Sequence, residues 1–324
     1  MTSAARPFLD RYAGKTVLVT GGGGYVGSAL IAALSNHAGR ILRMSRHQLP
    51  SLTGVEDVIA DPRRKDAWEC AAQADVTFHL AAETSVYAAA TDPEASLAAN
   101  VVPVLHALAA LRPGAALIAA GTVTQFGLTT QLPVTQASPD HPVTVYDLHK
   151  LMAEKHIALA VAEGKARGCL LRLANVYGPS PVMAGSADRG ILNKVVAAAL
   201  ASKPVSVFGH GNYLRDYIYI DDVVAAFLAA GVSGRAQDGT GWIIASGTGH
   251  PFGEAFRLAV RQVALITGTE VPIGSRDWPP GMSPIEFRNF VGDSAAFSEA
   301  TGWSPTTSLV EGIAKTIAAF QAES

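Results

Sequence analysis

The feature that most constrains the fold is a glycine run placed directly after an apolar stretch. Residues 15–20 read KTVLVT and residues 21–27 read GGGGYVG, which gives glycines the GxxGxxG spacing. An uninterrupted β-branched run is typical of a strand covered on both faces. Missing Cβ atoms let the backbone approach a diphosphate, and the start of the next helix, expected by Ser28, stabilises the anion. We therefore predict a dinucleotide site that includes Gly21, Gly24, Tyr25, Val26 and Gly27.

The same alternation of strand and helix continues along the chain. Apolar runs recur at 40–44, 76–81, 116–120, 169–173 and 242–245, and stretches with helical spacing lie at 28–34 and 96–111. Strands that alternate with helices favour βαβ units and a parallel sheet. We predict an α/β fold, a doubly wound parallel sheet of the Rossmann type with a smaller, interleaved C-terminal substrate lobe.

The second half of the chain has a different texture. Prolines and glycines interrupt the pattern from Pro179, in a segment expected to cap the substrate, and helices are predicted at 191–201 and 308–321, with a loop over 272–289. These changes predict a cofactor-binding domain over 14–178, with a returning segment at 217–246. The substrate lobe would comprise 179–216 and 247–324.

Charge and composition exclude several classes of protein. With 25 basic and 27 acidic residues, the chain has no basic excess to drive generic binding to nucleic acid. No apolar run approaches the roughly 18 residues of a membrane span, and no secretory h-region precedes the first strand. Cys70 and Cys169 lie far apart and are predicted to be buried thiols rather than metal ligands. We expect a cytoplasmic protein with no metal, nucleic-acid or membrane partner.

The end of the second strand bears on the choice of cofactor. An acidic residue there bonds the ribose of NAD, whereas arginine accommodates the phosphate of NADP. The strand ends Arg43-Met44-Ser45-Arg46 and has no acid. Ser45 and Arg46, with Arg43 as a further candidate, favour NADP over NAD, the alternative being a solvated basic edge beside an NAD site. Asp61 is placed to cover the adenine edge, or else starts a turn before Pro62.

Tyr146 and Lys150 stand four residues apart in the run YDLHK. This spacing puts both side chains on one face of a helix. A nearby ammonium stabilises phenolate, so we expect a lowered tyrosine pKa and an acid/base that exchanges a proton with a hydroxyl. Because the YxxxK spacing is common by chance, it indicates a catalytic site only when other motifs of the chain support it.

Several motifs in order extend the pattern over residues 15–320. They are FHLAA at 78–82, Asn100-Val101, GTVTQFG at 121–127, YDLHK, RLANVYGP at 172–179, RDYI at 215–218 and GWSP at 302–305. With the glycine loop, this set resembles the extended short-chain dehydrogenase/reductases that act on nucleotide-activated sugars.

The resemblance implies roles for individual residues. Tyr146 would be the acid/base, Lys150 would hold the nicotinamide ribose, and Thr122 would bond the reacting sugar oxygen. The implied cofactor contacts are Leu80, Ala81, Ala82 and Asn100. The implied substrate contacts are Thr84, Thr124, Asn175, Arg215 and Arg288, the last three toward the diphosphate of a nucleotide sugar. Without the family, Arg215 and the adjacent Asp216 would read as a surface ion pair.

The residues after Thr122 separate the reactions of this family. Sugar dehydratases and decarboxylases of this kind carry an acidic residue there, whereas this chain has Val123 and Thr124. Glu83 is the nearby acidic residue that would have to compensate, and we expect it to cap or solvate a loop instead. We therefore predict an NAD(P)-dependent epimerase that works through a transient ketone, with an NADPH-dependent keto-sugar reductase as the alternative. A non-catalytic cofactor sensor is disfavoured because Thr122, Tyr146 and Lys150 are all present.

The family also implies how copies of the chain assemble. Helices near 96–111 and 146–162 would pair across a two-fold axis to form a homodimer. The alternative is that their small apolar faces pack against the sheet of the same chain.

Overall fold

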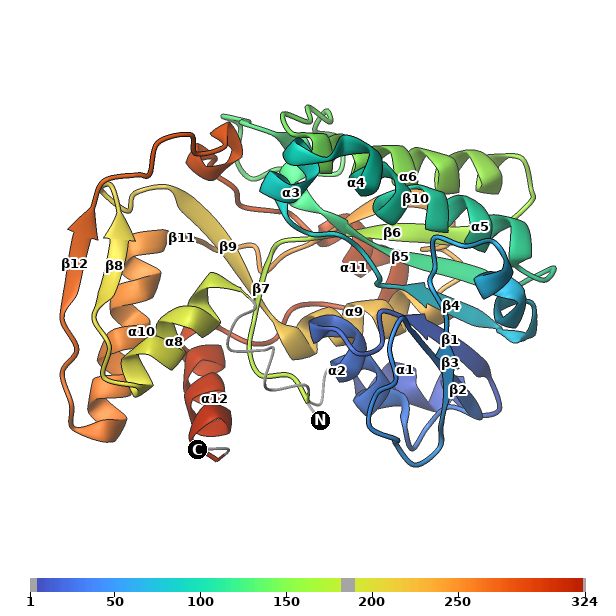
Figure 1. The fold of residues 1–324 in the computed structure, drawn as a ribbon, viewed down its shortest axis with the longest axis horizontal. Coiled ribbons are helices and arrows are strands. Elements are labelled where there is room, and N and C mark those ends of the chain that lie inside the picture. The colour runs from blue at the N-terminus through green and yellow to red at the C-terminus, as the bar shows by residue number, and fades with distance from the viewer. Residues whose placement is uncertain (1–4, 182–189, 323–324) are drawn as a thin grey trace.

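A seven-stranded parallel sheet forms the centre of the computed structural model, which describes residues 5–181 and 190–322 (Figure 1). Its order is β3-β2-β1-β4-β5-β6-β10. The strands are β1 (Thr16–Thr20), β2 (Arg40–Ser45), β3 (Val55–Ile59), β4 (Val76–His79), β5 (Ala116–Thr122), β6 (Arg167–Leu173) and β10 (Asp238–Ile244). The predicted doubly wound sheet is confirmed. Of the seven strands, the prediction from apolar runs omitted only β3, an edge strand whose half-exposed sequence VEDVI contains no such run.

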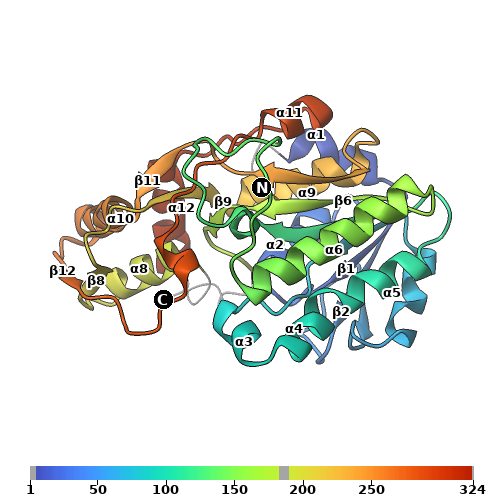
Figure 2. The same ribbon diagram turned by 90° about the horizontal axis from the view of Figure 1, so that it is seen from above.

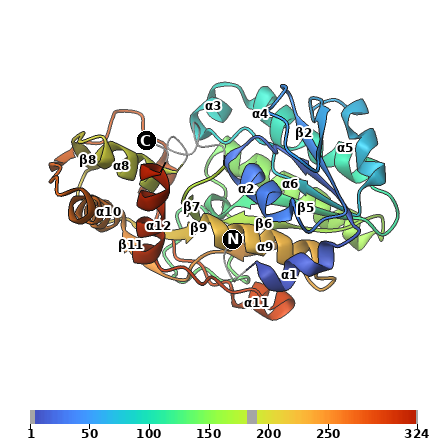
Figure 3. The ribbon, with the colours of Figure 1, turned by 90° about the horizontal axis from the view of Figure 1, so that it is seen from below.

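Helices cover both faces of this sheet because successive strand residues point to opposite sides. Val17 and Val19 pack in one core with α2 (Tyr25–Leu34) and α9 (Ile220–Val232). Leu18 packs in a second core with η2 (Asp66–Gln73), α5 (Val102–Ala110) and α6 (Val145–Ala162). Figure 2 shows α3 (Val86–Thr91), α4 (Pro93–Asn100), α5 and α6 from one side, and Figure 3 shows α1 (Arg6–Leu9), α2 and α9 from the other.

The helical pattern over 96–111 does not form one helix, which corrects the prediction. α4 ends at Asn100 and α5 begins at Val102. Pro103 has no N–H to donate to a carbonyl four residues earlier, so the helix is interrupted and restarts with proline in its first turn.

A third hydrophobic core belongs to the smaller lobe. It lies among α8 (Ile191–Leu200), α10 (Phe252–Thr267) and α12 (Leu309–Gln321). Two small sheets accompany it: β11 (Gly249–Pro251), β9 (Leu214–Tyr219) and β7 (Asn175–Tyr177) form one, and β12 (Ile273–Arg276) and β8 (Val205–Phe208) form the other. The predicted helices at 191–201 and 308–321 are confirmed, and Ser308 caps α12 by accepting the Glu311 N–H.

The segment 272–289, predicted to be a loop, contains two regular elements. β12 pairs in parallel with β8, and η4 spans Pro284–Phe287. Because β8, the partner of β12, lies far away in the sequence, the local Pro and Gly content could not predict that 273–276 form a strand. The predicted capping segment from Pro179 runs partly through 182–189, which lie outside the described residues.

The GWSP motif anchors the late chain beneath the main sheet. Trp303 Nε1 donates to the Asp222 carbonyl at 2.9 Å, and the Asp222 carboxylate accepts the N–H groups of Thr306 and Thr307. α11 (Ala295–Thr301) packs its Phe297 into the core that contains α9. Helix α9 thus connects the sheet to the C-terminal part of the chain. The boundaries of the two domains expected from the sequence stay a prediction.

Three findings bear on the classes of site and partner. Of the two cysteines, Cys169 is buried, but Cys70 is only partly buried, which corrects the expectation for Cys70. Across residues 5–181 and 190–322, no three His, Cys, Asp or Glu side chains gather as they would around a metal ion. None of the helices in those ranges combines the length and apolar character that crossing a bilayer requires.

Candidate active site

A cavity of about 780 Å³ opens at the carboxyl ends of the central strands. This is the edge at which parallel α/β sheets bind ligands. The predicted residues that line it are Gly21, Gly24, Tyr25, Val26, Gly27, Ser45, Arg46, Asp61, Leu80, Ala81, Ala82, Thr84, Thr122, Tyr146 and Lys150. The fold therefore brings most of the expected cofactor and catalytic residues around one space.

The backbone of the glycine loop lies so close to neighbouring backbone atoms that a side chain at Gly21 or Gly27 would clash with them. Gly21 has a φ of +68°, and a Cβ there would lie 2.7 Å from the Ala81 backbone nitrogen. A Cβ on Gly27 would overlap the Gly21 carbonyl oxygen. Gly24 precedes the first residue of α2, so the N–H groups at the start of that helix face the loop. The loop is therefore shaped for a diphosphate, which fits a dinucleotide cofactor.

The basic residues at the end of β2 do not act alike. Arg43 is buried and bonded to Asp57 at 2.6 Å and to the Pro50 carbonyl at 2.8 Å, so it is not available to a cofactor phosphate. Arg46 is exposed and lines the cavity, while the Ser45 hydroxyl donates to the His47 carbonyl.

Asp61 lies on the same wall of the cavity, bonded to Arg63. These hydrogen bonds hold the pKa of Asp61 at about 2, so the carboxylate is charged at neutral pH.

Tyr146 and Lys150 lie on one face of α6 at the floor of the cavity. Lys150 Nζ donates to the Ala120 carbonyl at 2.7 Å, and burial lowers the pKa of Lys150 to about 8. Burial raises the pKa of Tyr146, and the carboxylates of Asp147 and Glu83 raise it further. The lowered tyrosine pKa expected from the sequence is not found, because burial and these two carboxylates govern the phenol while Lys150 bonds a carbonyl.

Thr122 ends β5 and begins a chain of hydrogen-bonded oxygens that leads away from the cavity. Its Oγ1 lies 2.7 Å from Thr124 Oγ1, and Thr124 Oγ1 in turn forms a short hydrogen bond with Asp147 Oδ1. Thr124 does not line the cavity and Asp147 is fully buried. Sequence reasoning missed Asp147, although it stands inside the YDLHK motif.

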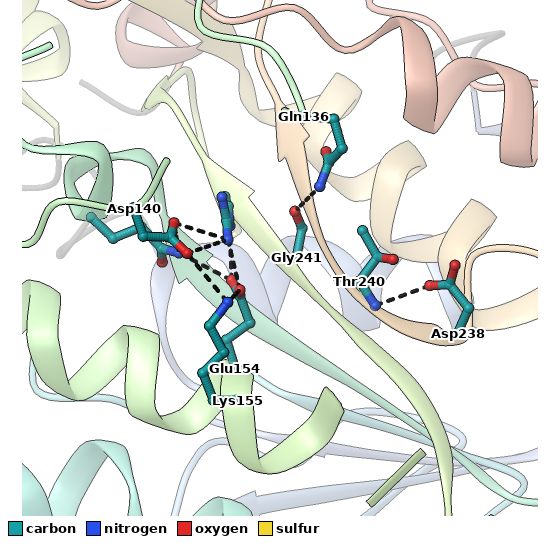
Figure 4. A network of polar contacts seen from close by, with 9 residues as sticks. Gln136, Asp140, Glu154, Lys155, Asp238, Thr240 and Gly241 are labelled. Atoms are coloured by element: carbon teal, nitrogen blue, oxygen red, sulfur yellow. Dashed lines mark hydrogen bonds and ion pairs between the residues drawn. The ribbon is translucent and has the colours of Figure 1, made fainter. Parts of the chain in front are cut away.

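A buried ionic network fixes the turn of α6 that follows Tyr146 and Lys150 (Figure 4). Glu154, four residues beyond Lys150, receives two hydrogen bonds from Arg172, at 2.8 and 2.6 Å. Asp140 also pairs with Arg172 at 3.0 Å, and Lys155 joins the network from the surface. Gln125 donates to both Asp140 and Glu154, so the loop after Thr122 is attached to the same point.

Asn100 supports the site from behind rather than from its wall. Its Nδ2 donates to the Glu83 carbonyl at 3.1 Å and to Ser96 Oγ at 3.4 Å. Ser96 Oγ also bonds His149 Nδ1, which precedes Lys150 in α6. Asn100 thus holds the loop after β4 against α6.

Asn175, Arg215 and Arg288 form a separate group that does not line this cavity. Arg288 donates to Asn175 Oδ1 at 3.2 Å and to the Ile285 carbonyl. Arg215 donates to the carbonyls of Leu214, Glu286 and Arg288. Burial, helped by the positive charge of Arg288, lowers the pKa of Arg215 to about 10. In the described part of the chain, the hydrogen-bond partners of these guanidinium groups are carbonyl and amide oxygens, not carboxylates.

The surface ion pair between Arg215 and Asp216 does not form. Both residues are buried, and Asp216 instead accepts hydrogen bonds from the backbone of Ser246, Gly247 and Gly292. Successive strand residues point to opposite sides of β9, so adjacent charges cannot pair.

Comparison with known proteins bears on this arrangement. The model of the NAD dependent epimerase/dehydratase family matches residues 17–245. The UDP-glucose 4-epimerase of Mycolicibacterium smegmatis is 29% identical, over 95% of this chain and 99% of that protein. A UDP-glucose 4-epimerase of Azospirillum brasilense is 27% identical, over 94% and 91%. The crystal structure of Thermotoga maritima UDP-glucose 4-epimerase with UDP-glucose superposes with a TM-score of 0.83 at 26% identity, covering 95% of this chain and 99% of that one.

Proposed function

Because the chain belongs to the NAD dependent epimerase/dehydratase family, we propose that it is an NAD(P)-dependent epimerase of a nucleotide-activated sugar. The match confirms the family expected from the motif order. The observation that carries the proposal is the placement of Thr122, Tyr146 and Lys150 around the cavity onto which the glycine loop opens. Hydride transfer coupled to one proton transfer needs no other catalytic group.

The residues of the chain have separate tasks in this reaction. A nicotinamide cofactor held in this cavity would supply the hydride acceptor and donor for the reaction. As a phenolate, Tyr146 would take the proton of the reacting hydroxyl and later give it back, and Thr122 would hydrogen-bond the same oxygen. This role requires that bound cofactor and substrate offset the burial and the carboxylates that raise the pKa of Tyr146. Lys150 binds the cofactor ribose, and the glycine loop binds its diphosphate.

Dehydration and decarboxylation are not supported by the surroundings of Thr122. Val123 is buried in the hydrophobic core, and the Thr124 hydroxyl is engaged by Thr122 and Asp147. Glu83, the other nearby carboxyl, accepts the Ser85 N–H at 2.8 Å in the loop before α3. Elimination would need an acid that reaches the sugar. Positions 123 and 124 offer none, and Glu83, although it lines the cavity, has one carboxylate oxygen engaged by the Ser85 N–H.

A nucleoside diphosphate is the substrate portion that best suits Arg215, Arg288 and Asn175. Both guanidinium groups are buried, and the positive charge of Arg288 adds to the burial that lowers the pKa of Arg215, so a strong anion would be favoured beside them. The relatives above are named for UDP sugars. We extend that class of substrate, without a particular sugar, to this chain.

NADP is the cofactor form that we propose at the adenosine end. The support for this proposal is that the exposed Arg46 lines the cavity next to Ser45, and that β2 ends without an acid. The same observation favours the second candidate, a reductase of a nucleotide keto sugar, because a reductase exchanges its cofactor at every turnover. Titration with NAD⁺ and NADP⁺ tests the assignment. Arg46→Ala should weaken NADP⁺ at least tenfold and leave NAD⁺ unchanged, and equal effects on both would contradict it.

The experiment that tests the main proposal combines cofactor release with turnover. Denatured protein should release a tightly held nicotinamide dinucleotide, and UDP sugars should be interconverted without added cofactor. Tyr146→Phe should lose at least a hundredfold in kcat with the cofactor still bound. Full turnover by Tyr146→Phe, or strict dependence on added NADPH, would exclude an epimerase that uses Tyr146 and a retained cofactor.

We further propose that the chain forms a homodimer and acts in the cytoplasm. Four leucines of α4, α5 and α6 are 37–56% exposed: Leu97, Leu105, Leu148 and Leu159. Such a face suits pairing with a second copy. A monomeric mass at micromolar concentration would contradict the dimer. The free thiols of Cys70 and Cys169 suit a reducing compartment.

A further inference from the structure

A fully buried carboxyl group is connected to the catalytic threonine through one intervening hydroxyl. Thr122 Oγ1, Thr124 Oγ1 and Asp147 Oδ1 follow one another at hydrogen-bond distance, the first pair at 2.7 Å. Thr122 lines the cavity, whereas Asp147 has no exposed surface. The chain of oxygens therefore leads from Thr122 at the cavity to Asp147, which solvent does not reach.

The number of protons in this chain fixes the direction of every hydrogen bond. Each hydroxyl donates once, and a carboxylate only accepts. When Asp147 is ionised, Thr124 must donate to it and Thr122 must donate to Thr124. The Thr122 proton then points away from the cavity. A lone pair of Thr122 faces the reacting oxygen, and it repels the oxygen of a ketone.

Protonation of Asp147 on Oδ1, the oxygen that contacts Thr124, reverses the whole chain. The acid then donates to Thr124, and Thr124 donates to Thr122. Thr122 also accepts the Thr124 backbone N–H at 3.2 Å, so both of its lone pairs are used. Its own proton is left to face the cavity, where it can hydrogen-bond the oxygen of a ketone or of a forming alkoxide.

We propose that Asp147 is a positioning residue for Thr122, and that its protonated form directs the Thr122 hydroxyl proton at the reacting oxygen by way of Thr124. The inference rests on the function proposed above. It adds a group to the catalytic machinery that does not touch the substrate. Ionisation of Asp147 turns the Thr122 proton away and slows both hydride transfers.

The surroundings of Asp147 allow both charge states. Burial raises the pKa of Asp147, whereas hydrogen bonds from Thr124 and Thr144 and the positive charge of Arg288 lower it. Asp147 Oδ2 has no hydrogen-bond partner among the described residues, and neither has the nearby Arg288 Nε. The other titratable neighbour is Tyr146, whose pKa a charged Asp147 raises.

Arg288 is itself influenced from further along the chain. Glu286 precedes it by two residues, and Tyr217 lies on β9; both stabilise the charged form of Arg288, although burial lowers its pKa. The carboxylate of Asp147 also stabilises the charged form of Arg288. A nucleotide anion bound at Arg288 would reduce the positive field on Asp147 and favour its protonated form.

Thr144 and Asp147 also occupy the first and fourth places of a helix cap. Thr144 Oγ1 accepts the Asp147 N–H at 3.1 Å. A cap alone would make Asp147 a stabilising residue without influence on how turnover depends on pH. The test therefore measures titration and not only activity.

The first measurement needs no substrate. Infrared spectra of the full-length protein from about pH 4 to about pH 9 record the C=O stretch of protonated carboxyl groups, a range that spans known buried carboxyls. A band that persists above the ordinary carboxyl range should disappear in Asp147→Asn and shift in Thr124→Val. Asp221→Asn is the control, since burial also raises the pKa of Asp221, and it should leave that band in place. Absence of the band from the parent protein overturns the proposal, whatever reaction the enzyme catalyses.

The second measurement is the pH profile of kcat. The parent should lose about tenfold per pH unit above the pH at which the band titrates. Asp147→Asn and Thr124→Val should lack this decline, because an amide does not titrate and valine breaks the chain. Thr124→Ser, which keeps the hydroxyl, should retain it. The same decline in all four proteins would overturn the proposal even if the epimerase assignment holds.

Discussion

The attachment of α6 to the sheet through Glu154 gives a prediction whose size follows from the structure. The Glu154 side chain is 3% exposed and that of Arg172 is 5% exposed. Removing one partner of a buried ion pair costs about 3–5 kcal/mol, because the other charge is left buried. In Glu154→Gln, Asp140 still contacts Arg172, so we expect the lower end, about 3 kcal/mol.

This cost translates into a modest change in melting temperature. Unfolding entropy of about 2.1 cal/mol/K per residue gives roughly 0.7 kcal/mol/K for 324 residues. Glu154→Gln should therefore melt about 4 °C below the parent in calorimetry. Lys155→Gln is the matched control: Lys155 contacts the same network from the next position, but its side chain is 60% exposed. Its loss should stay below about 1 kcal/mol.

A double variant separates burial of charge from loss of packing. Glu154→Leu combined with Arg172→Met removes both charges and keeps the volume apolar, so it should recover most of the stability lost by Glu154→Leu alone. The reasoning is refuted if Glu154→Gln and Lys155→Gln melt at the same temperature. It also fails if the double variant is as unstable as the sum of its single substitutions.

Three further predictions concern the glycine loop, the late anchor and pH. Gly27→Ala should weaken dinucleotide binding at least tenfold in a fluorescence titration, since its Cβ would overlap the Gly21 carbonyl; unchanged affinity would contradict this. Asp222→Asn should cost about 1–3 kcal/mol in urea unfolding, because the carboxylate accepts three hydrogen bonds from Thr306 and Thr307; no loss would count against the anchor. Burial lowers the pKa of His79 to about 3, against about 6.5 unfolded, so the unfolded chain takes up a proton first and stability falls as pH drops below about 6.5, by about 2 kcal/mol at pH 5. Urea midpoints at pH 7 and pH 5 should differ less in His79→Gln than in the parent, and an equal difference would contradict the assignment.

The parts of the fold that the sequence predicts are those whose cause is local. KTVLVT followed by four glycines indicates both a buried strand and a phosphate loop, and the structure has β1 and a cavity there. Tyr146 and Lys150 share a helix face because their spacing alone requires it. By contrast, β12 forms a strand only because it pairs with β8. Arg43 cannot bind a cofactor phosphate because it is bonded to Asp57 of another strand.

Asp147 illustrates why part of the site could not be predicted. Its neighbours in the sequence mark it only as a residue in the first turn of a helix. Its contact with Thr124 is set by the packing of α6 against the loop after β5, a relation between segments 23 residues apart. The direction of the Tyr146 pKa shift is wrong in the sequence-based prediction for the same reason, because burial and the carboxylate of Glu83 arise only in three dimensions.

The separation of the hydrophobic cores has a consequence for how such a protein can change over evolution. Tyr146, Lys150 and Thr122 are attached to elements of the central sheet, whereas α8, α10 and α12 pack around a core of their own. Under the proposed function, substitutions that reshape the smaller lobe for another sugar can therefore accumulate without disturbing the geometry of proton transfer. One chemical step could in this way be kept while the range of accepted substrates drifts.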